Sequence, residues 1–365
     1  MTRNNCLAKS MIIAVIALVA CSRQSANESL TTINVDITDI NEMLIDSAGI
    51  VPLEVNDSSL LYGVDKLILT DGKYIIHSRA AIKTFDAKTG RHLYNISQKG
   101  EGPGEYLSLF KVWIIGDTLH LLDSDKRSVL LFDIDGSYLY SIAQKYPSDD
   151  ISVPKANFLF ESPYGNGYFS QNRMVGGNPE NYVDNYSLFD KDFNYLHDIK
   201  GRKATDSSFS FESGYTDREH MRMLVWDSLK DTIFNIEEDR VYPLFAINYG
   251  SNSMSNEERN GDSYYERAIA FMNNDSYKLG DAGSLRVKDG YLYFTFIDNK
   301  ESHYICRYNE ATGQSKVYKL VDPNGRYYET SQFEINGDKA MVWLMDQIDT
   351  EANPAIYTFN LSAFN

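Results

Sequence analysis

A short hairpin phrase recurs along the chain and limits the folds that the chain can adopt. In the clearest copy, residues 85–94 read FDAKTGRHLY, an aromatic residue followed by Asp, a polar turn and an alternating segment. The flanking segments repeat with a period of two, which indicates β-strands rather than helices. The six copies begin at Phe85, Phe132, Phe189, Phe234, Tyr308 and Phe359.

The spacing of the copies predicts the architecture. Successive copies lie 45 to 74 residues apart, and repeats of about 40–50 residues are typical of β-propellers. Asp or Asn suits the turn of each hairpin, and Gly90, Gly136 and Gly313 supply positive φ there. We therefore expect an all-β fold, a six-bladed β-propeller of four-stranded blades. The expected blades are residues 62–98, 108–143, 155–200, 206–249, 283–321 and 329–361.

Ring closure is expected to use an N-terminal strand. The sixth copy stops at Asn365 without an outer strand, and residues 50–55 (IVPLEV) form a spare strand before the first blade. Pairing between the two would hide exposed sheet edges. Pro52 suits an edge strand, because one missing N–H does no harm there.

The longest interval between copies contains an insertion at about residues 250–280. Within it, Ala268, Ile269 and Met272 recur at helical spacing. We expect a short helix there, between blades 4 and 5 and over one face of the ring.

The first residues read as a lipoprotein signal peptide (1–20). Arg3 and Lys9 precede an apolar run of ten residues that is too short to span a bilayer. Leu-Val-Ala-Cys at 18–21 matches the bacterial lipoprotein cleavage box, so Cys21 is the expected lipidation site; an ordinary signal peptide is the alternative. Residues 21–32 then form a tether and residues 33–365 the propeller. Ser22, not Asp, follows Cys21, which favours anchoring in the outer membrane of the cell envelope. Both the periplasmic face and the cell-surface face of that membrane are compatible with the sequence.

The net charge limits the classes of binding partner, and the cysteine content limits the disulfides that the chain can form. The net charge is −16, and loss of Arg3 and Lys9 removes two positive charges to give −18. This argues against nucleic acid as a partner, which needs basic patches; the membrane is reached through the lipid instead. Cys306 is left alone in the mature propeller, so no intramolecular disulfide is expected. We expect a monomeric propeller.

The segment between blades 1 and 2 has the most specific sequence. Residues 99–106 read KGEGPGEY, and the glycines and proline impose an unusual backbone path. The glycine spacing and the two Glu residues do not fit a dinucleotide loop. A tight connection between strands is one interpretation, and a binding role for Glu101, Glu105 and Tyr106 is the other.

This segment resembles the GxGPGEY hallmark of six-bladed β-propeller lipoproteins of Bacteroides and relatives, which are distantly similar to NHL-repeat propellers. Residues 51–54 (VPLE), 59–63 (SLLYG) and 231–234 (DTIF) also resemble that family. The resemblance covers roughly residues 48–362. It implies a cell-envelope propeller and no settled activity, and it offers no catalytic set to carry over to this chain. The longer insertion before blade 5 departs from the family pattern.

No motif for catalysis or cofactor binding stands out. The six His residues lack metal-ligand spacing, and nucleophile elbows and phosphate loops are absent from the sequence. We therefore expect no cofactor and no metal. Arg173, Arg218 and His220 could face the central pocket with the Glu residues of the loop. The candidate binding residues are Gly100, Glu101, Gly102, Pro103, Gly104, Glu105, Tyr106, Arg173, Arg218 and His220.

Two functional hypotheses follow. The first is a non-catalytic binding or scaffold module that holds a protein or glycan partner through loops over the channel; it rests on analogy with other propellers. The alternative is a hydrolase or lyase with carboxylate, His and Arg groups in the central funnel. A purely structural component of the envelope would have no pocket.

Overall fold

The computed structural model describes most of the chain from residue 30 onward. The predicted signal peptide, Cys21 and most of the predicted tether lie outside the described residues. The described residues are 30–79, 81–145, 158–173, 184–199, 212–227, 229, 231–255, 257–258, 264–322, 324–328, 333–344 and 353–364.

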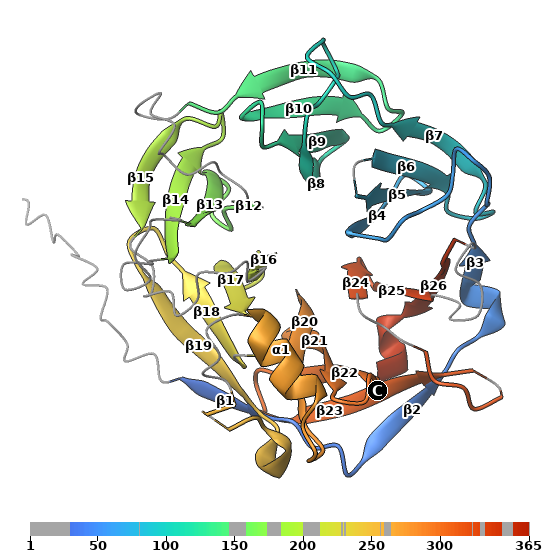
Figure 1. The fold of residues 1–365 in the computed structure, drawn as a ribbon, viewed down its shortest axis with the longest axis vertical. Coiled ribbons are helices and arrows are strands. Elements are labelled where there is room, and N and C mark those ends of the chain that lie inside the picture. Colours follow the sequence, from blue (N-terminus) through green and yellow to red (C-terminus); the bar gives the residue numbers. More distant parts are fainter. Residues whose placement is uncertain are drawn as a thin grey trace, which may run out of the picture.

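Six sheets, each built on four antiparallel strands, stand around a central axis, and the predicted six-bladed propeller is confirmed (Figure 1). In each blade the first strand lies nearest the axis. Blade 1 comprises β4 (Lys66–Thr70), β5 (Lys73–Ser78), β6 (Ala81–Asp86) and β7 (His92–Ile96). Blade 2 comprises β8 (Leu109–Ile115), β9 (Thr118–Asp123), β10 (Ser128–Asp133) and β11 (Tyr138–Ala143). Blade 3 comprises β12 (Phe158–Glu161), β13 (Gly167–Arg173), β14 (Asp184–Asp190) and β15 (Tyr195–Ile199).

The other half of the ring repeats this order. Blade 4 comprises β16 (Glu212–Asp217), β17 (Arg222–Asp227), β18 (Thr232–Ile236) and β19 (Val241–Asn248). Blade 5 comprises β20 (Leu279–Lys288), β21 (Tyr291–Asp298), β22 (His303–Asn309) and β23 (Ser315–Val321). Blade 6 comprises β24 (Phe333–Asn336), β25 (Lys339–Leu344) and β26 (Ala355–Asn360), with β3 (Ile50–Pro52) as its outer strand.

The recurring phrase marks the outer hairpin of the blades. In blades 1 to 4 the strand register shifts at its aromatic residue, for example between Thr84 and Phe85. In blades 1 to 3 the Asp that follows caps the turn with its side chain. For example, Asp86 Oδ1 accepts from the backbone N–H groups of Lys88 and Thr89. Such side-chain acceptors favour the turn over continued strand. The aromatic residue points into the core, and Phe85 is fully buried.

The predicted closure is confirmed, because β3 pairs antiparallel with β26. Glu54 N–H extends the contact by donating to the Gly90 carbonyl of blade 1 at 2.9 Å. Gly90 has φ +71°, and a Cβ there would lie 1.9 Å from the Pro52 carbonyl oxygen. Glycine is therefore required both for the turn and for the close approach of the closing strand.

Two further N-terminal strands were not predicted. β1 (Thr31–Asn34) adds in parallel to β19 of blade 4, and β2 (Ile40–Leu44) adds in parallel to β23 of blade 5. β1 begins inside the segment expected to be a tether. Both strands run along the outside of the ring (Figure 1). They cover outer edges that would otherwise be unpaired.

A helix lies in the insertion before blade 5, as predicted. Helix α1 (Tyr264–Met272) buries Arg267 and Phe271, while Ile269 is 42% exposed. Phe271 packs with Leu229 and Met254. Ala268 and Met272 of the predicted apolar face pack against this cluster, whereas Ile269 does not. The 3-10 helices within the described segments are η1 (Ser47–Gly49), η3 (Gly250–Asn252) and η4 (Leu361–Phe364).

The hydrophobic core lies in layers between neighbouring blades. For example, Trp226 and Phe245 of blade 4 belong to the same cluster as Phe294 and Tyr308 of blade 5. Each such aromatic side chain buries a large apolar area, so every blade depends on its neighbours for stability. No helix among the described residues is long and apolar enough to cross a membrane.

Candidate functional site: the central channel

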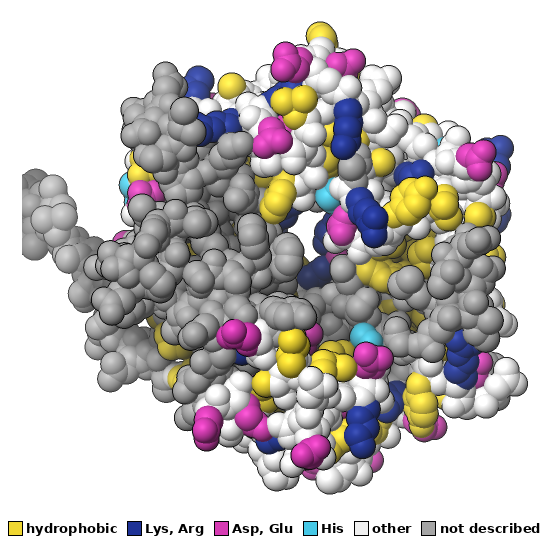
Figure 2. Space-filling model, in the orientation of Figure 1, with side chains coloured by type: hydrophobic (Ala, Val, Ile, Leu, Met, Phe, Trp, Pro, Cys, Tyr) yellow, Lys and Arg dark blue, Asp and Glu magenta, His cyan; other side chains and the backbone are white. Residues whose placement is uncertain are grey.

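The first strands of the six blades enclose a channel of ≈790 Å³ at the centre of the ring. Figure 2 shows Lys and Arg side chains deep in the opening at the centre of the ring. Of the described residues that line the channel, four are Lys or Arg and three are Asp or Glu. The channel is thus positive by one charge in a chain of net charge −16. The charged lining residues are Asp65, Lys66, Lys111, Glu161, Arg218, Arg286 and Glu334.

Glu334 joins three blades through its carboxylate. Lys66 Nζ of blade 1 lies 2.6 Å from Glu334 Oε1, and Arg286 Nε of blade 5 donates to Oε2 at 2.9 Å. Burial opposes ionisation of Glu334, but the charges of Arg286 and Lys66 hold its pKa below the ordinary value. A general acid needs a raised pKa, so this carboxylate is suited to holding cations rather than to donating protons.

Lys111 is the exception among the channel cations. Its Nζ lies 3.4 Å from the centroid of the Phe160 ring, and no carboxylate of the described residues forms an ion pair with it. Burial, followed by the neighbouring charge of Lys66, lowers the Lys111 pKa well below its ordinary value. The cation–π contact offsets only part of that cost, since such contacts contribute about 0.5–2 kcal/mol.

A smaller side pocket of ≈170 Å³ opens beside Lys66 and Lys111. His77 lies in its wall, and its Nε2–H donates to the Arg79 carbonyl at 2.9 Å. Burial lowers the His77 pKa, so the ring is neutral near pH 7. Asp65 Oδ2 accepts from Arg79 N–H at 2.7 Å, which fixes that carboxylate against the backbone.

Glu161 and Arg218 form an ion pair between blades 3 and 4. Arg218 Nη2 lies 2.5 Å from Glu161 Oε2, and the Arg218 side chain is 65% exposed. Thr216 donates its hydroxyl to the Glu161 carbonyl at 2.6 Å and tightens the same boundary. Among the predicted site residues whose side chains the structure describes, Arg218 is the one that lines the channel.

The glycine-rich segment uses most of its own groups internally. Gly102 N–H donates to Glu105 Oε2 at 2.9 Å, and Lys126 Nζ donates to the Glu105 carbonyl at 2.7 Å. The Tyr106 side chain is fully buried, while Glu101 is exposed. A Cβ on Gly100 would lie 2.0 Å from Glu105 Oε2. These contacts give Gly100, Gly102 and Glu105 a clear structural role.

Asp123 fixes the end of this segment. Its Oδ2 accepts from Leu107 N–H at 2.7 Å, and its Oδ1 accepts from the N–H groups of Ser108, Asp125 and Lys126. The carboxylate is fully buried. Its lone pairs are thus occupied by the backbone of two loops.

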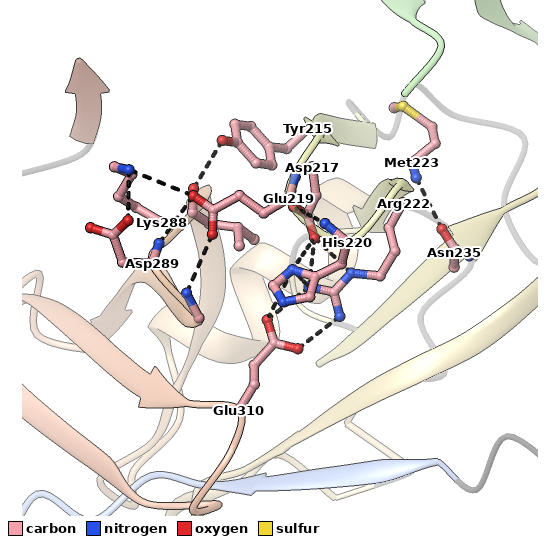
Figure 3. Close-up of polar contacts among 12 residues, drawn as sticks. Tyr215, Asp217, Glu219, His220, Arg222, Met223, Asn235, Lys288, Asp289 and Glu310 are labelled. Atoms are coloured by element: carbon pink, nitrogen blue, oxygen red, sulfur yellow. Dashed lines mark hydrogen bonds and ion pairs between the residues drawn. The ribbon is translucent and has the colours of Figure 1, made fainter. Parts of the chain in front are cut away.

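His220 takes part in a polar network between blades 4 and 5 (Figure 3). Arg222 donates to Asp217 Oδ2 at 2.7 Å and to both oxygens of Glu310, at 2.8 and 2.7 Å. His220 Nδ1 lies 3.0 Å from Asp217 Oδ2. Arg222 is therefore the centre of a bidentate contact that ties the blades together.

The structure separates two groups of predicted site residues. Arg218 and His220 follow the inner strand β16, whereas residues 100–106 precede the inner strand β8. Every inner strand runs in the same direction, so the two groups lie on opposite faces of the ring, and residues 100–106 do not line the channel. Arg173 lies in β13, opposite Asp184, and its side chain is outside the described residues.

Sequence reasoning missed Lys66, Lys111, Arg286 and Glu334. The available signal was a single charge inside an apolar first strand, as in Leu-Arg-Val at 285–287 and Phe-Glu-Ile at 333–335. A charge in one such strand is unremarkable, but several first strands share the pattern. Among the described residues, no group of three or more His, Cys, Asp and Glu is arranged to hold a metal ion.

The ring of six sheets and its charged channel define a six-bladed propeller with a polar centre. The family described as "Domain of unknown function (DUF4934)" matches residues 26–360, and the chain belongs to that family. None of the curated proteins compared with the chain matches it.

Solved structures are similar in fold. One is a Bacteroides fragilis protein whose name marks it as a candidate for export; it is 16% identical, with a TM-score of 0.61, over 90% of this chain and 99% of that one. Another is a member of the DUF4221 family from Bacteroides vulgatus, 9% identical with a TM-score of 0.54, over 88% of this chain and 100% of that one. At these identities the likeness concerns the fold.

Proposed function

We propose that the chain is a non-catalytic binding propeller that holds a protein or glycan partner through its central channel. The observation that carries this proposal is the channel itself, whose lining gathers seven charged side chains among aromatic and aliphatic ones. Polar groups converging in a concave site are typical of ligand binding.

We further propose that the protein is exported and anchored to the outer membrane through lipid on Cys21. The lipoprotein box at residues 18–21 supports the anchor. The name of the similar Bacteroides fragilis protein supports export. Metabolic labelling with a clickable fatty acid tests the anchor: label on the wild type and none on Cys21→Ser is the expected result.

The geometry gives less support to the hydrolase or lyase alternative. Glu334 is held by two cations, and Glu161 is held by Arg218. A carboxylate pair for glycoside hydrolysis needs one member with a raised pKa, and burial alone does not achieve this for Glu334. A binding function therefore explains the ion-paired state of Glu334 and Glu161 better than catalysis does.

A binding screen with a filled-channel variant tests the proposal. Trp113 and Trp226 line the channel, so ligand entry should change their fluorescence once Trp343 is replaced by Phe. Glycans and peptides are titrated into the full-length protein in detergent, with Ile335→Trp as the filled channel and Glu101→Ala as the loop control. Binding that Ile335→Trp abolishes and Glu101→Ala retains supports the channel. Loss of binding in Glu101→Ala alone would move the site to the glycine-rich loop.

A further inference from the structure

We propose that the side pocket of Lys66, Lys111 and His77 is an anion subsite that binds a carboxylate or phosphate group of the ligand. The inference rests on the proposed binding function and specifies the chemical class of the ligand. It begins from the ≈170 Å³ pocket, which is continuous with the larger channel because both share Lys66, Lys111 and His77. A volume of this size suits one small group rather than a whole ligand.

The charges around the pocket are incompletely matched. Glu334 faces both Lys66 and Arg286, so one carboxylate serves two cations. Asp65, the other acid in the pocket wall, accepts a backbone hydrogen bond from Arg79. Lys111 is left without a carboxylate partner within the described part of the chain. The pocket therefore lacks one negative charge.

The position of Lys111 is energetically unfavourable without an additional anion. The Lys111 side chain is half-buried, and burial together with the charge of Lys66 disfavours its charged form, while the weaker effect of the Glu161 charge favours it. A buried charge is normally paired or hydrogen-bonded. A bound carboxylate or phosphate would supply that partner and would accept hydrogen bonds from Lys111 and Lys66 together.

The surroundings favour an anion over a cation as the occupant. Glu334 and Glu161, which lie in the adjoining channel, are already paired with Lys66, Arg286 and Arg218. Asp65, the acid of the pocket wall, accepts from the Arg79 N–H. A cation would add to the positive excess, whereas an anion would remove it. The Lys111 ammonium already rests on the Phe160 ring, with Nζ 3.4 Å from the ring centroid, so it is positioned before a ligand arrives.

Small anions test this subsite directly. Inorganic phosphate, acetate, glucuronate and glucose are titrated separately into the full-length protein in detergent, with affinity measured by calorimetry and by channel tryptophan fluorescence. We expect glucuronate to bind at least about tenfold more tightly than glucose, the size of effect that one charged hydrogen bond gives. A preference for phosphate over acetate would identify a phosphate group as the natural ligand group, and the reverse preference a carboxylate.

Two substitutions of Lys111 and one matched control make the test specific. Lys111→Met and Lys111→Gln should weaken anion binding about tenfold or more. Lys316→Met removes an exposed strand lysine on β23 and should leave it unchanged. Thermal unfolding of each variant shows that it is folded.

The outcomes separate this inference from the broader proposal. If glucose and glucuronate bind equally in the channel, or if both Lys111 variants keep full anion affinity, the subsite is refuted while channel binding stands. If ligands bind but the Ile335→Trp variant has no effect on them, the channel proposal itself fails. If none of the four probes binds, the anion subsite is refuted.

Discussion

Glu334 Oε1 lies 2.6 Å from Lys66 Nζ, so an ion pair spans the boundary between the last blade and the first. The same carboxylate binds Arg286 of blade 5, and its side chain is only 9% exposed. The ring is therefore closed twice, by β3 on the outside and by this cluster beside the axis.

Removing the Glu334 charge should destabilise the propeller. In Glu334→Gln, Lys66 and Arg286 remain close together without a counter-charge, and breaking one side of a buried pair is costly. We expect a loss of about 2–3 kcal/mol in the free energy of unfolding, measured by urea denaturation. Glu101→Gln, on the exposed loop, should change stability by less than about 0.5 kcal/mol. Equal effects of the two substitutions would contradict the structural role of the cluster.

The same ion cluster predicts a pH dependence. The Glu334 pKa is lower in the folded state than its ordinary value of 4.5, so its contribution is present above pH 4.5 and is lost as the pH falls through the folded pKa. The wild type should therefore lose stability more steeply below pH 4.5 than Glu334→Gln does. Parallel acid-unfolding curves would show that Glu334 contributes nothing.

Replacing Lys111 should stabilise the protein while weakening anion binding. Lys111→Met removes a desolvated ammonium and its repulsion from Lys66, and replacing a buried charge by an apolar side chain often stabilises a fold. We expect a gain of about 1 kcal/mol in the free energy of unfolding without ligand. Lys316→Met provides the baseline. A net loss of stability in Lys111→Met would mean that the lysine is there for structure.

Two glycines with the same φ separate backbone strain from close approach. Gly90 and Gly313 both have φ +71°, but a Cβ on Gly90 would meet Pro52 whereas a Cβ on Gly313 would meet open space. Gly313→Ala should cost about 1 kcal/mol from the left-handed conformation alone. Gly90→Ala should cost at least about 2 kcal/mol more, because β3 must move. Similar melting temperatures for the two variants would exclude a role of Gly90 in ring closure.

Asp123 should contribute more to the free energy of unfolding than Glu101, the exposed acid of the loop that Asp123 fixes. Asp123→Ala leaves four backbone N–H groups without their acceptor, and we expect a loss of about 3 kcal/mol. Hydrogen exchange at Leu107 and Ser108 should accelerate in this variant and not in Glu101→Ala. Unchanged protection at those two amides would show that Asp123 does not hold the loop.

The sequence predicted local structure better than it predicted the site. The phrase at Phe85-Asp86 marks both a register shift and a turn cap, which are local events, so its repetition identified the blades. Strands β1 and β2 were missed because four or five residues that pair in parallel with distant strands carry little local signal. The contact of Lys66 with Glu334 joins residues 268 positions apart, and only closure of the ring brings them together.

The most direct test of the account is crystallographic. Crystals of the protein soaked with 4-bromobenzoate would locate a carboxylate ligand through the anomalous signal of its bromine. We expect a bromine peak in the central channel, with the carboxylate on Lys111 and Lys66, and loss of that peak in Lys111→Met. Bromine peaks confined to the outer surface, or a channel peak that persists in Lys111→Met, would contradict it.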